Sequence, residues 1–502
     1  MDSEEKNSAF DKRLKRQVIG KPHRFLAVVP LGFEKTFVRE MDFLRRESVE
    51  NQGTSSLDIK IAGDGKVEFT AKLVDAWKVV AYSRIANRIL MHIADFKAEN
   101  FRELEKKAAE IPWNLFLTTN HQPLTTIHVT CKHSRLYHSD AVAERLQKVI
   151  EGGSLPLAAA PVGSSATPSA GTPRNAPKSE ASNLAPHTSN LYVTLIDDRC
   201  TLWLDLAGEE LYKRGHERFV NDAPLKETIA AAILQEAFNA AILTTNHQPL
   251  ITLIDPMSGS GTFSLEAAYI ANGLIPGKCR DFALKHQPAF KPATWNHIVN
   301  SANANPNPSL RRNNDSELSL QRNDNSMLSL QRNEVTAAIK SPIQKIVTSD
   351  ISERAVEIIQ HNVECCPLAD IAPSANAPTI NPQLRDFFSY TAKEIADLCG
   401  ESAPVIVLNP PYGKRLDFDS PKLYTQIGKK FAELARELAP LGKQLTVAIL
   451  APKDDSRPGS KYTCTANLLH ECPALDPQQN SDAKNIVTSH GGLSLNAIIA
   501  RI

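Results

Sequence analysis

The chain has 502 residues, of which 42% are hydrophobic and 23% are charged, so it can form two or three domains around substantial cores. Its formal net charge of +1 excludes a protein that is basic as a whole, and any surface for nucleic acid must be local. The eight cysteines form no CxxC pair, and no run of about 18 apolar residues is present. We therefore expect a cytoplasmic protein with no disulfide framework, metal site or membrane segment.

The N-terminal part begins with a polar segment and continues as a mixed module. Residues 1–23 carry a cluster of Lys and Arg side chains, which favours a disordered tail over an arm that contacts RNA. Apolar spacings then predict strands at 24–30, 67–70 and 125–132, one long amphipathic stretch at 76–96, and helices at 31–44, 97–110 and 140–150. Together these elements predict a small α/β module.

Three segments have a biased composition. Residues 151–190 are rich in Pro, Ala, Ser and Gly and predict a disordered linker, because they bury too little apolar surface to offset their ordering entropy. Residues 301–341, which repeat S-L-[QR]-R-N, and the Pro/Ala-rich residues 369–382 predict disordered insertions. The octapeptide LTTNHQPL occurs at 117–124 and at 243–250. A duplicated connector is a simpler interpretation of it than a pair of histidine ligands.

Strands and helices alternate in the C-terminal half. A hairpin is expected at 191–208, with Asp197 and Asp198 at its turn. The pattern then predicts strands at 252–255, 345–350, 405–409 and 444–452, and helices at 226–242, 263–272, 352–364 and 421–438. Strands that alternate with helices of this length predict an α/β fold with a doubly wound parallel sheet.

The first candidate motif is DPMSGSGTF, in which an apolar strand ends at Asp255 and continues into a turn of small residues. Small side chains let a ligand approach backbone N–H groups closely, and the carboxylate can face a cationic group. The candidate ligand-binding residues of this motif are Asp255, Pro256, Ser258, Gly259, Gly261 and Thr262. Turns of this kind are common in nucleotide-binding folds, so the motif alone does not define a reaction.

The second motif follows another apolar strand and consists of Asn409, Pro410, Pro411 and Tyr412. The lone pair of an exocyclic amino group is delocalised into its ring, which makes the nitrogen a poor nucleophile. Carbonyl oxygens of Asn409 and Pro410 can accept its hydrogens and orient the lone pair, and Tyr412 offers a stacking face for an extruded base. The two motifs together predict a methyltransferase that uses S-adenosyl-L-methionine, with these four residues as the catalytic site.

Two further carboxylates extend the predicted cofactor site. Asp350 ends the second parallel strand, where it can accept hydrogen bonds from ribose hydroxyls, although a role at the start of the next helix is an equal alternative. Asp386 follows an insertion and can reach an adenine amino group. Both residues, together with Asn409, complete the predicted cofactor-binding set.

With these motifs the chain resembles a known family, the THUMP-domain RNA guanine-N2 methyltransferases, particularly the bacterial type that modifies 23S rRNA (the m2G2445 family). The resemblance rests on DPMSGSGTF, NPPYGKRL, the block at 206–234 and the segment HVTCKHSRLYHSDAVAERL at 128–146. Ser258 stands where the family often has Cys, and the insertions and the duplicated octapeptide are unusual.

The resemblance implies a ferredoxin-like element at 24–60, a THUMP RNA-binding fold at 61–150 and a Rossmann-like methyltransferase domain at 191–502. It implies formation of N2-methylguanosine, with 23S rRNA or an assembling ribosomal particle as the partner. Protein partners remain unassigned. The basic positions that it places against RNA are Lys132, His133, Arg135, His138, Lys213 and Arg214.

Three alternatives remain open at the level of sequence. A guanine-N2 methyltransferase of the same superfamily can act on tRNA. The Asn-Pro-Pro-Tyr motif also serves adenine N6 in DNA, but the THUMP-like module argues against DNA. A non-catalytic RNA-binding or assembly factor with a degenerate fold is disfavoured by the intact Asp255, Asp350 and Asn409.

Overall fold

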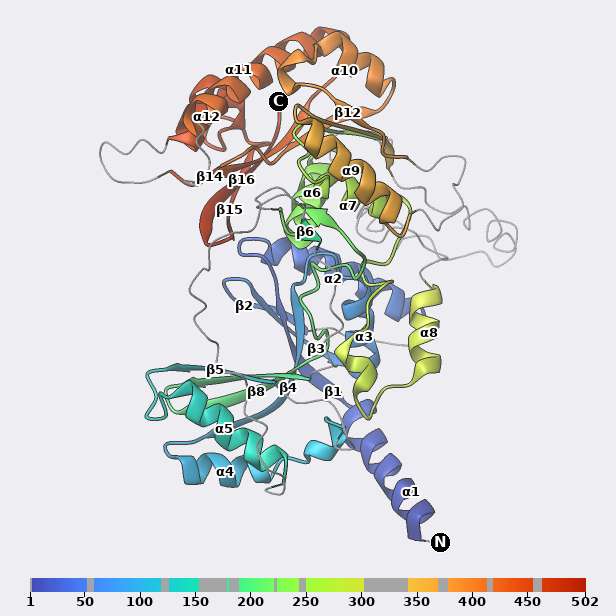
Figure 1. The fold of residues 1–502 in the computed structure, drawn as a ribbon, viewed down its shortest axis with the longest axis vertical. Coiled ribbons are helices and arrows are strands. Elements are labelled where there is room, and N and C mark those ends of the chain that lie inside the picture. Colours follow the sequence, from blue (N-terminus) through green and yellow to red (C-terminus); the bar gives the residue numbers. More distant parts are fainter. Residues whose placement is uncertain are drawn as a thin grey trace, which may run out of the picture.

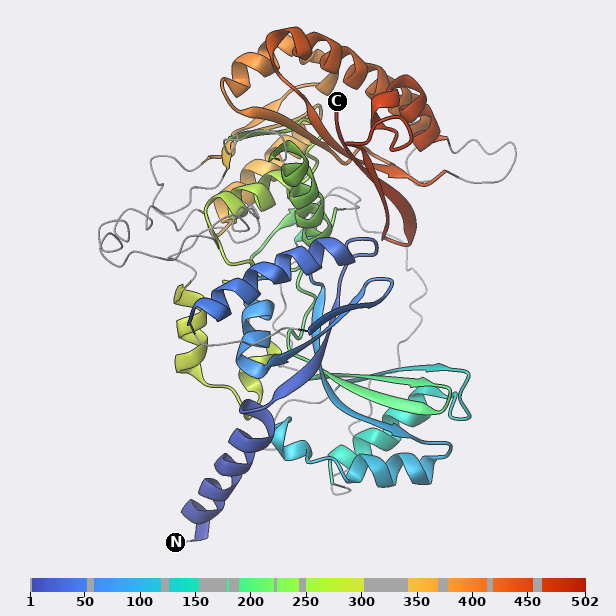
Figure 2. The ribbon, with the colours of Figure 1, turned by 180° about the vertical axis from the view of Figure 1, so that it is seen from behind.

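The computed structural model describes residues 2–51, 58–118, 126–152, 178–179, 189–220, 224–242, 250–301, 342–368, 378–412, 419–454 and 463–502. Two large sheets, each with its own helices, follow one another along the longest axis of the molecule (Figures 1 and 2). The predicted linker, both predicted insertions and both octapeptide copies lie wholly or largely outside the described residues.

The first sheet contains seven strands in the order β2-β3-β1-β4-β8-β7-β5. Every neighbouring pair is antiparallel except β5 and β7, which run parallel. Its strands are β1 (Pro22–Val28), β2 (Asp58–Gly63), β3 (Lys66–Lys72), β4 (Arg88–Lys97), β5 (Thr126–Lys132), β7 (Asn190–Ile196) and β8 (Arg199–Asp205). Its helices are α1 (Asp2–Leu14), the π-helix η1 (Lys15–Ile19), α2 (Glu34–Asn51), α3 (Leu73–Tyr82), α4 (Phe101–Ala109) and α5 (Ser139–Ile150).

The second sheet contains seven strands in the order β12-β11-β10-β13-β14-β16-β15. The pairings from β12 to β14 are parallel, and β16 pairs antiparallel with both β14 and β15. Its strands are β10 (Ile251–Asp255), β11 (Ile343–Asp350), β12 (Pro382–Leu384), β13 (Ala403–Leu408), β14 (Thr446–Pro452), β15 (Lys484–His490) and β16 (Leu493–Arg501). This confirms the predicted α/β fold with a largely parallel, doubly wound sheet.

Helices cover the second sheet and bury its central strands. All five residues of β10 are buried, as expected for a parallel strand with helices on both faces. The helices of this half are α6 (Glu227–Ile242), α7 (Thr262–Ala271), α9 (Glu353–Cys365), α10 (Ala392–Cys399), α11 (Ser420–Leu438) and α12 (Cys464–Glu471). Helix α8 (Pro292–Ser301) lies instead beside α3 of the first half (Figures 1 and 2). A short ladder joins β6 (Lys178–Ser179) to β9 (Phe219–Val220).

The two halves share one continuous apolar core. The largest buried cluster contains Phe37 and Trp77 from the first half and Phe238 and Leu253 from the second. Polar contacts cross the same boundary: Tyr82 Oη donates a hydrogen bond to the carbonyl oxygen of Ile298 at 2.5 Å. A shared core of this kind fixes the position of the second sheet relative to the first.

The prediction of a disordered N-terminal tail is wrong for residues 2–21. Phe10, Leu14 and Val18 lie four residues apart, so they occupy one face of α1 and η1. Leu14 and Val18 are buried in the large core, and Phe10 packs against it. The regular spacing of these apolar residues, within a strongly basic stretch, provides the burial that orders the segment.

The long amphipathic stretch predicted at 76–96 is two elements. Helix α3 ends at Tyr82, and Ser83 adopts an extended conformation with φ −65° and ψ 126°. Residues 88–97 form β4, which pairs with β1 on one side and β8 on the other. The apolar residues of 88–96 fit either periodicity, and the two available strand edges decide in favour of a strand.

The predicted hairpin at 191–208 forms. It belongs to the N-terminal half, whereas the sequence pattern predicts it in the C-terminal half. Its strands β7 and β8 complete the first sheet between β5 and β4. Leu191, Val193 and Leu202 are buried in a cluster with residues of α4 and α5. The buried side chains of the hairpin therefore belong to the same core as α4 and α5.

Candidate active site

The carboxyl ends of three neighbouring parallel strands bring the two predicted motifs together. Strand β10 ends at Asp255, β11 ends at Asp350, and β13 is followed at once by Asn409. In the ladders, Asp255 lies opposite Thr348 of β11, and Ile254 lies opposite Ile406 of β13. The order of the strands reverses at β10 and β13, which is the position where open α/β sheets form ligand crevices.

Asp255 is fully buried with one carboxylate oxygen satisfied and one not. Its Oδ2 accepts hydrogen bonds from Ser264 N at 3.2 Å and Ser264 Oγ at 2.8 Å. Its Oδ1 has no hydrogen-bond partner among the described residues. Burial raises the pKa of Asp255 to about 7, against the opposing effect of the Ser264 hydrogen bonds and with a smaller contribution from Asp350.

The turn of residues 256–262, named here the cofactor turn, is attached to β11. Ser258 Oγ donates to the carbonyl oxygen of Ser349 at 2.8 Å, and Gly259 N donates to Asp350 Oδ2 at 2.9 Å. Asp350 Oδ1 accepts from Ser352 N at 2.9 Å. Asp350 thus fixes the backbone of two loops, and a carboxylate that accepts these two hydrogen bonds keeps lone pairs for a further donor.

Two glycines shape the cofactor turn in different ways. Gly261 has φ +79°, and a Cβ there would lie 3.2 Å from the side chain of Ile359, so the turn packs closely on α9. Gly259 has φ +57°, and a Cβ there would meet nothing within 4 Å. The backbone at Gly259 is therefore open to approach, while the backbone at Gly261 is packed against the protein.

The sequence did not reveal two side chains that hold the cofactor turn from the outside. Buried Arg218 donates to Ser260 Oγ at 3.0 Å and also to Thr262 Oγ1 and Glu227. Buried Asn362, on α9, donates to the carbonyl oxygen of Ser260 at 3.1 Å. Arg218 stands inside the block at 206–234 that carried the resemblance, but nothing in the sequence signalled the role of Asn362.

Asn409 presents a buried carbonyl oxygen beside Asp255's strand. Asn409 Oδ1 has no hydrogen-bond partner within the described ranges, although it is shielded from solvent. Pro410 is buried, Pro411 is exposed, and Tyr412 is half-buried with its ring against the large core. Burial raises the pKa of the Tyr412 hydroxyl, which keeps that group neutral.

The third predicted carboxylate, Asp386, lies after β12 at the same edge of the sheet. Its Oδ1 accepts a hydrogen bond from Phe388 N at 3.0 Å, which caps a short 3₁₀-helix at Phe387–Ser389. Beside it the structure exposes two apolar side chains that the sequence did not single out, Ile351 at 71% and Leu384 at 61%. In the ladder, Leu384 lies opposite Asp350, so these apolar side chains flank the carboxylate edge.

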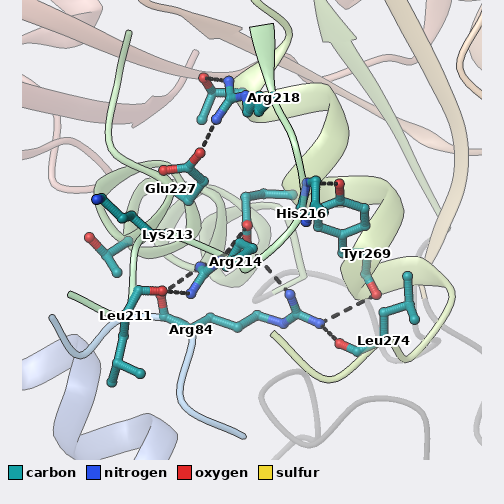
Figure 3. A network of polar contacts seen from close by, with 12 residues as sticks. Arg84, Leu211, Lys213, Arg214, His216, Arg218, Glu227, Tyr269 and Leu274 are labelled. Carbon is teal, nitrogen blue, oxygen red and sulfur yellow. Dashed lines mark hydrogen bonds and ion pairs between the residues drawn. The ribbon is translucent and has the colours of Figure 1, made fainter. Parts of the chain in front are cut away.

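Arg214 has a structural role, and the prediction that it binds RNA is wrong. Its side chain is buried and donates to Glu266 at 2.9 and 3.1 Å and to the carbonyl oxygen of Arg84 at 3.0 Å. Figure 3 shows Arg214 directed toward Arg84, away from Arg218 and Glu227. Buried Glu266 provides the charge that compensates Arg214. The neighbouring Lys213 is exposed and lies 3.4 Å from Glu209.

The remaining predicted RNA-binding side chains are exposed between β5 and α5. They are Lys132, His133, Arg135 and His138. Arg135 forms an ion pair with Glu99 and lies 3.8 Å from Asp198, and His133 lies 3.9 Å from Asp197. These side chains are accessible to RNA, but Arg135 already lies beside two carboxylates.

The described part of the chain offers no group of three or more His, Cys, Asp and Glu side chains arranged to hold a metal ion. A search of the same residues finds no helix with the length and apolar content needed to cross a membrane.

Comparison with known proteins gives this site a class. Residues 214–448 match the family model UPF0020, described as an RMKL-like methyltransferase domain. Over 420 residues the chain is 26% identical to the "Putative RNA methyltransferase YpsC" of Bacillus subtilis, covering 82% of this chain and 86% of that protein. It is also 26% identical over 417 residues to the "Ribosomal RNA large subunit methyltransferase K/L" of Shewanella sp. (strain MR-7), covering 81% of this chain but only 46% of that protein. The chain thus spans about half the length of the K/L protein that it matches.

Solved structures share the whole fold. A "putative methyltransferase complexed with SAH" superposes with a TM-score of 0.60 at 22% identity, covering 96% of this chain and 98% of that one. A "predicted N6-adenine-specific DNA methylase" of Listeria monocytogenes gives 0.59 at 21% identity, covering 95% and 96%. The family match and the fold together define the chain as a methyltransferase with a Rossmann-like catalytic domain.

Proposed function

We propose that the chain transfers a methyl group from S-adenosyl-L-methionine to the N2 amino group of a guanine in RNA, most specifically in 23S rRNA. The single observation that carries the proposal is the pair of buried acceptors Asp255 Oδ1 and Asn409 Oδ1 on adjacent strands, neither with a partner among the described residues. Buried polar atoms without partners cost free energy, so their presence at a switch point favours a site in which the cofactor satisfies one and the substrate satisfies the other.

The residues at this edge fit the cofactor. Asp255 Oδ1 suits a cationic amino acid moiety, Asp350 retains acceptor capacity for ribose hydroxyls, and the open backbone at Gly259 permits close approach. Exposed Ile351 offers an apolar contact for an adenine ring. When bound, S-adenosyl-L-methionine supplies an electrophilic methyl group on its sulfonium.

Asn409 and Tyr412 act on the substrate base in this proposal. The carbonyl oxygen of Asn409 accepts a hydrogen bond from the exocyclic amino group and stabilises the positive charge that develops on nitrogen during transfer, after which the surplus proton passes to solvent. The backbone oxygen of Pro410 accepts the second hydrogen. Tyr412 is half-buried and packs against the core, and in this proposal its ring stacks on an extruded base.

The choice of RNA and of guanine is supported by the resemblance and by the names of two relatives, an RNA methyltransferase and a ribosomal RNA large subunit methyltransferase. The candidate THUMP module remains residues 61–150, whose helices α4 and α5 pack with β7 and β8. A tRNA guanine remains the second candidate. The fold shared with a predicted DNA adenine methylase keeps adenine N6 as a third, which the same experiment separates.

The test is methyl transfer from radiolabelled cofactor to total RNA, separated into 23S, 16S and tRNA fractions, with duplex DNA in parallel. Nucleoside analysis of the labelled fraction is expected to yield N2-methylguanosine in 23S rRNA. Label in tRNA would change the substrate, and label in N6-methyladenine would reject the guanine assignment.

A further inference from the structure

A cluster of positive side chains at the end of α1 and in η1 lies outside the surface that the resemblance assigned to RNA. Residues 10–21, named here the basic arm, contain Lys12, Arg13, Lys15, Arg16 and Lys21 and only one acid, Asp11. All five cations are exposed. Among the side chains that the structure describes, none forms an ion pair with any of them.

We propose that the basic arm binds the phosphate backbone of the RNA substrate at a site remote from the methyl-transfer crevice. This inference rests on the proposed function, because it requires that the substrate is RNA. Exposed Lys and Arg side chains on a helix present charge to a polyanion without sequence preference, and they gain affinity through release of condensed counterions.

The basic arm is fixed to the body of the protein, which distinguishes it from a solvated tail. Leu14 and Val18 are 5% and 2% exposed, and both belong to the large core. The His23 side chain makes a hydrogen bond of 2.7 Å to the carbonyl oxygen of Val18. Because the apolar side is anchored in this way, the cations on the opposite side are held in place before RNA arrives, which lowers the entropic cost of binding.

Comparison with the segment at 132–138 strengthens the assignment. There, Arg135 pairs with Glu99 and lies near Asp198, so a phosphate must compete with carboxylates already in place. On the basic arm, no described carboxylate pairs with a cation, so a phosphate meets less competition there. The arm is therefore the stronger non-specific anchor, even though the other segment carries the family resemblance.

The position of the arm limits the kind of RNA that can use it. Helix α1 projects from the end of the molecule that carries α4 and α5, while α11 and α12 of the catalytic half occupy the other end of the longest axis (Figures 1 and 2). An RNA that contacts the arm while its target base lies at Asn409 must extend along the molecule. The inferred substrate is thus a long folded RNA, and a short oligonucleotide around the target base cannot make both contacts.

The experiment measures RNA affinity over a salt series for the full chain and for the variant Lys12→Gln/Arg13→Gln/Lys15→Gln/Arg16→Gln. The probe is a transcribed 23S rRNA domain, compared with a short hairpin that contains the same target. A matched control removes four exposed cations from α10 and α11 at the opposite end: Lys393→Gln, Lys422→Gln, Lys429→Gln and Arg436→Gln. Cofactor affinity and circular dichroism report folding, and a variant with Lys12→Arg and Lys15→Arg retains the charge.

We expect the arm variant to bind the long RNA at least about tenfold more weakly, with a salt slope reduced by about 0.7 to 0.9 for each phosphate that it no longer neutralises. Its affinity for the short hairpin and for cofactor should match the wild type. The control variant and the charge-retaining variant should match the wild type in long-RNA affinity and in salt slope. Wild-type affinity and slope in the arm variant would overturn the proposal. Unchanged RNA binding together with weaker binding to a ribosomal protein would assign the arm to an acidic protein instead. Failure of the wild type to bind any RNA would reject the proposed function as well.

Discussion

The two loops that meet at the switch point are built in opposite ways. The cofactor turn is held through Ser258, Gly259, Ser260 and Thr262 by hydrogen bonds to β11, α9 and Arg218. Asn409, at the end of the neighbouring strand, keeps its side-chain oxygen buried and without a described partner. The cofactor turn is therefore preorganised by its hydrogen bonds. The loop that begins at Asn409 instead keeps a hydrogen-bond acceptor available to a ligand.

The largest effect should come from removing that reserved acceptor. Asn409→Ala is expected to lower kcat by about 100- to 1000-fold, because the missing carbonyl acts on charge that develops only during transfer. Cofactor affinity, measured by calorimetry, should stay within about twofold of wild type if Asn409 acts on the substrate alone. An unchanged kcat would remove the functional distinction between the two loops.

The next effect concerns stability at the boundary of the two halves. Arg214→Leu leaves Glu266 buried without its principal partner and should lower the free energy of unfolding by about 3 kcal/mol. The measurement is urea denaturation followed by tryptophan fluorescence. The folded fraction should bind cofactor normally, because Arg214 does not touch the cofactor turn. Loss of cofactor affinity without loss of stability would contradict this division of roles.

Variants of Arg218 test whether the cofactor turn depends on the hydrogen bonds that hold it. Arg214, four residues away on the same segment, serves as the control position. Arg218→Gln removes the hydrogen bonds to Ser260 and Thr262 and should weaken cofactor binding by about tenfold, equivalent to about 1.4 kcal/mol. Arg218→Lys should recover part of the affinity, since one amine can reach one hydroxyl. If both variants bind cofactor like the wild type, the turn does not depend on this clamp.

The pH dependence of Asp255 gives the prediction with the most clearly defined sign. Its pKa is about 7 in the folded protein against an ordinary value of 3.8, so the folded state favours the protonated acid. Its contribution to stability is therefore most favourable at acidic pH and is lost as pH rises from about 4 to about 7. Relative to Asp255→Asn, the ligand-free wild type should be more stable at pH 5 than at pH 8 by urea denaturation.

The same ionisation affects the ligand in the opposite direction. A cationic amino acid moiety prefers the ionised carboxylate, so cofactor affinity of the wild type should rise between pH 6 and pH 8. Calorimetry of Asp255→Asn over this range should lack this rise. A flat profile in the wild type would mean that Asp255 does not face the cationic group.

The sequence predicted the catalytic half better than the N-terminal half, and the reasons are physical. Continuous apolar runs that end at Asp255 and Asn409 mark buried parallel strands, whose carboxyl ends necessarily share one edge. The placement of β4 and of the hairpin at 190–205 depended instead on pairing between distant segments, which local periodicity does not contain. Arg214 illustrates the same limit, because its carboxylate partner Glu266 lies 52 residues away in the chain.

Crystals of the protein grown with S-adenosylhomocysteine would show whether both loops line one crevice, on which the proposed methyl transfer depends. We expect the amino group of the ligand to lie within hydrogen-bonding distance of Asp255 Oδ1, with its sulfur directed toward Asn409 Oδ1. A ligand bound on a different surface, or one whose sulfur is separated from Asn409 by protein side chains, would contradict the shared crevice.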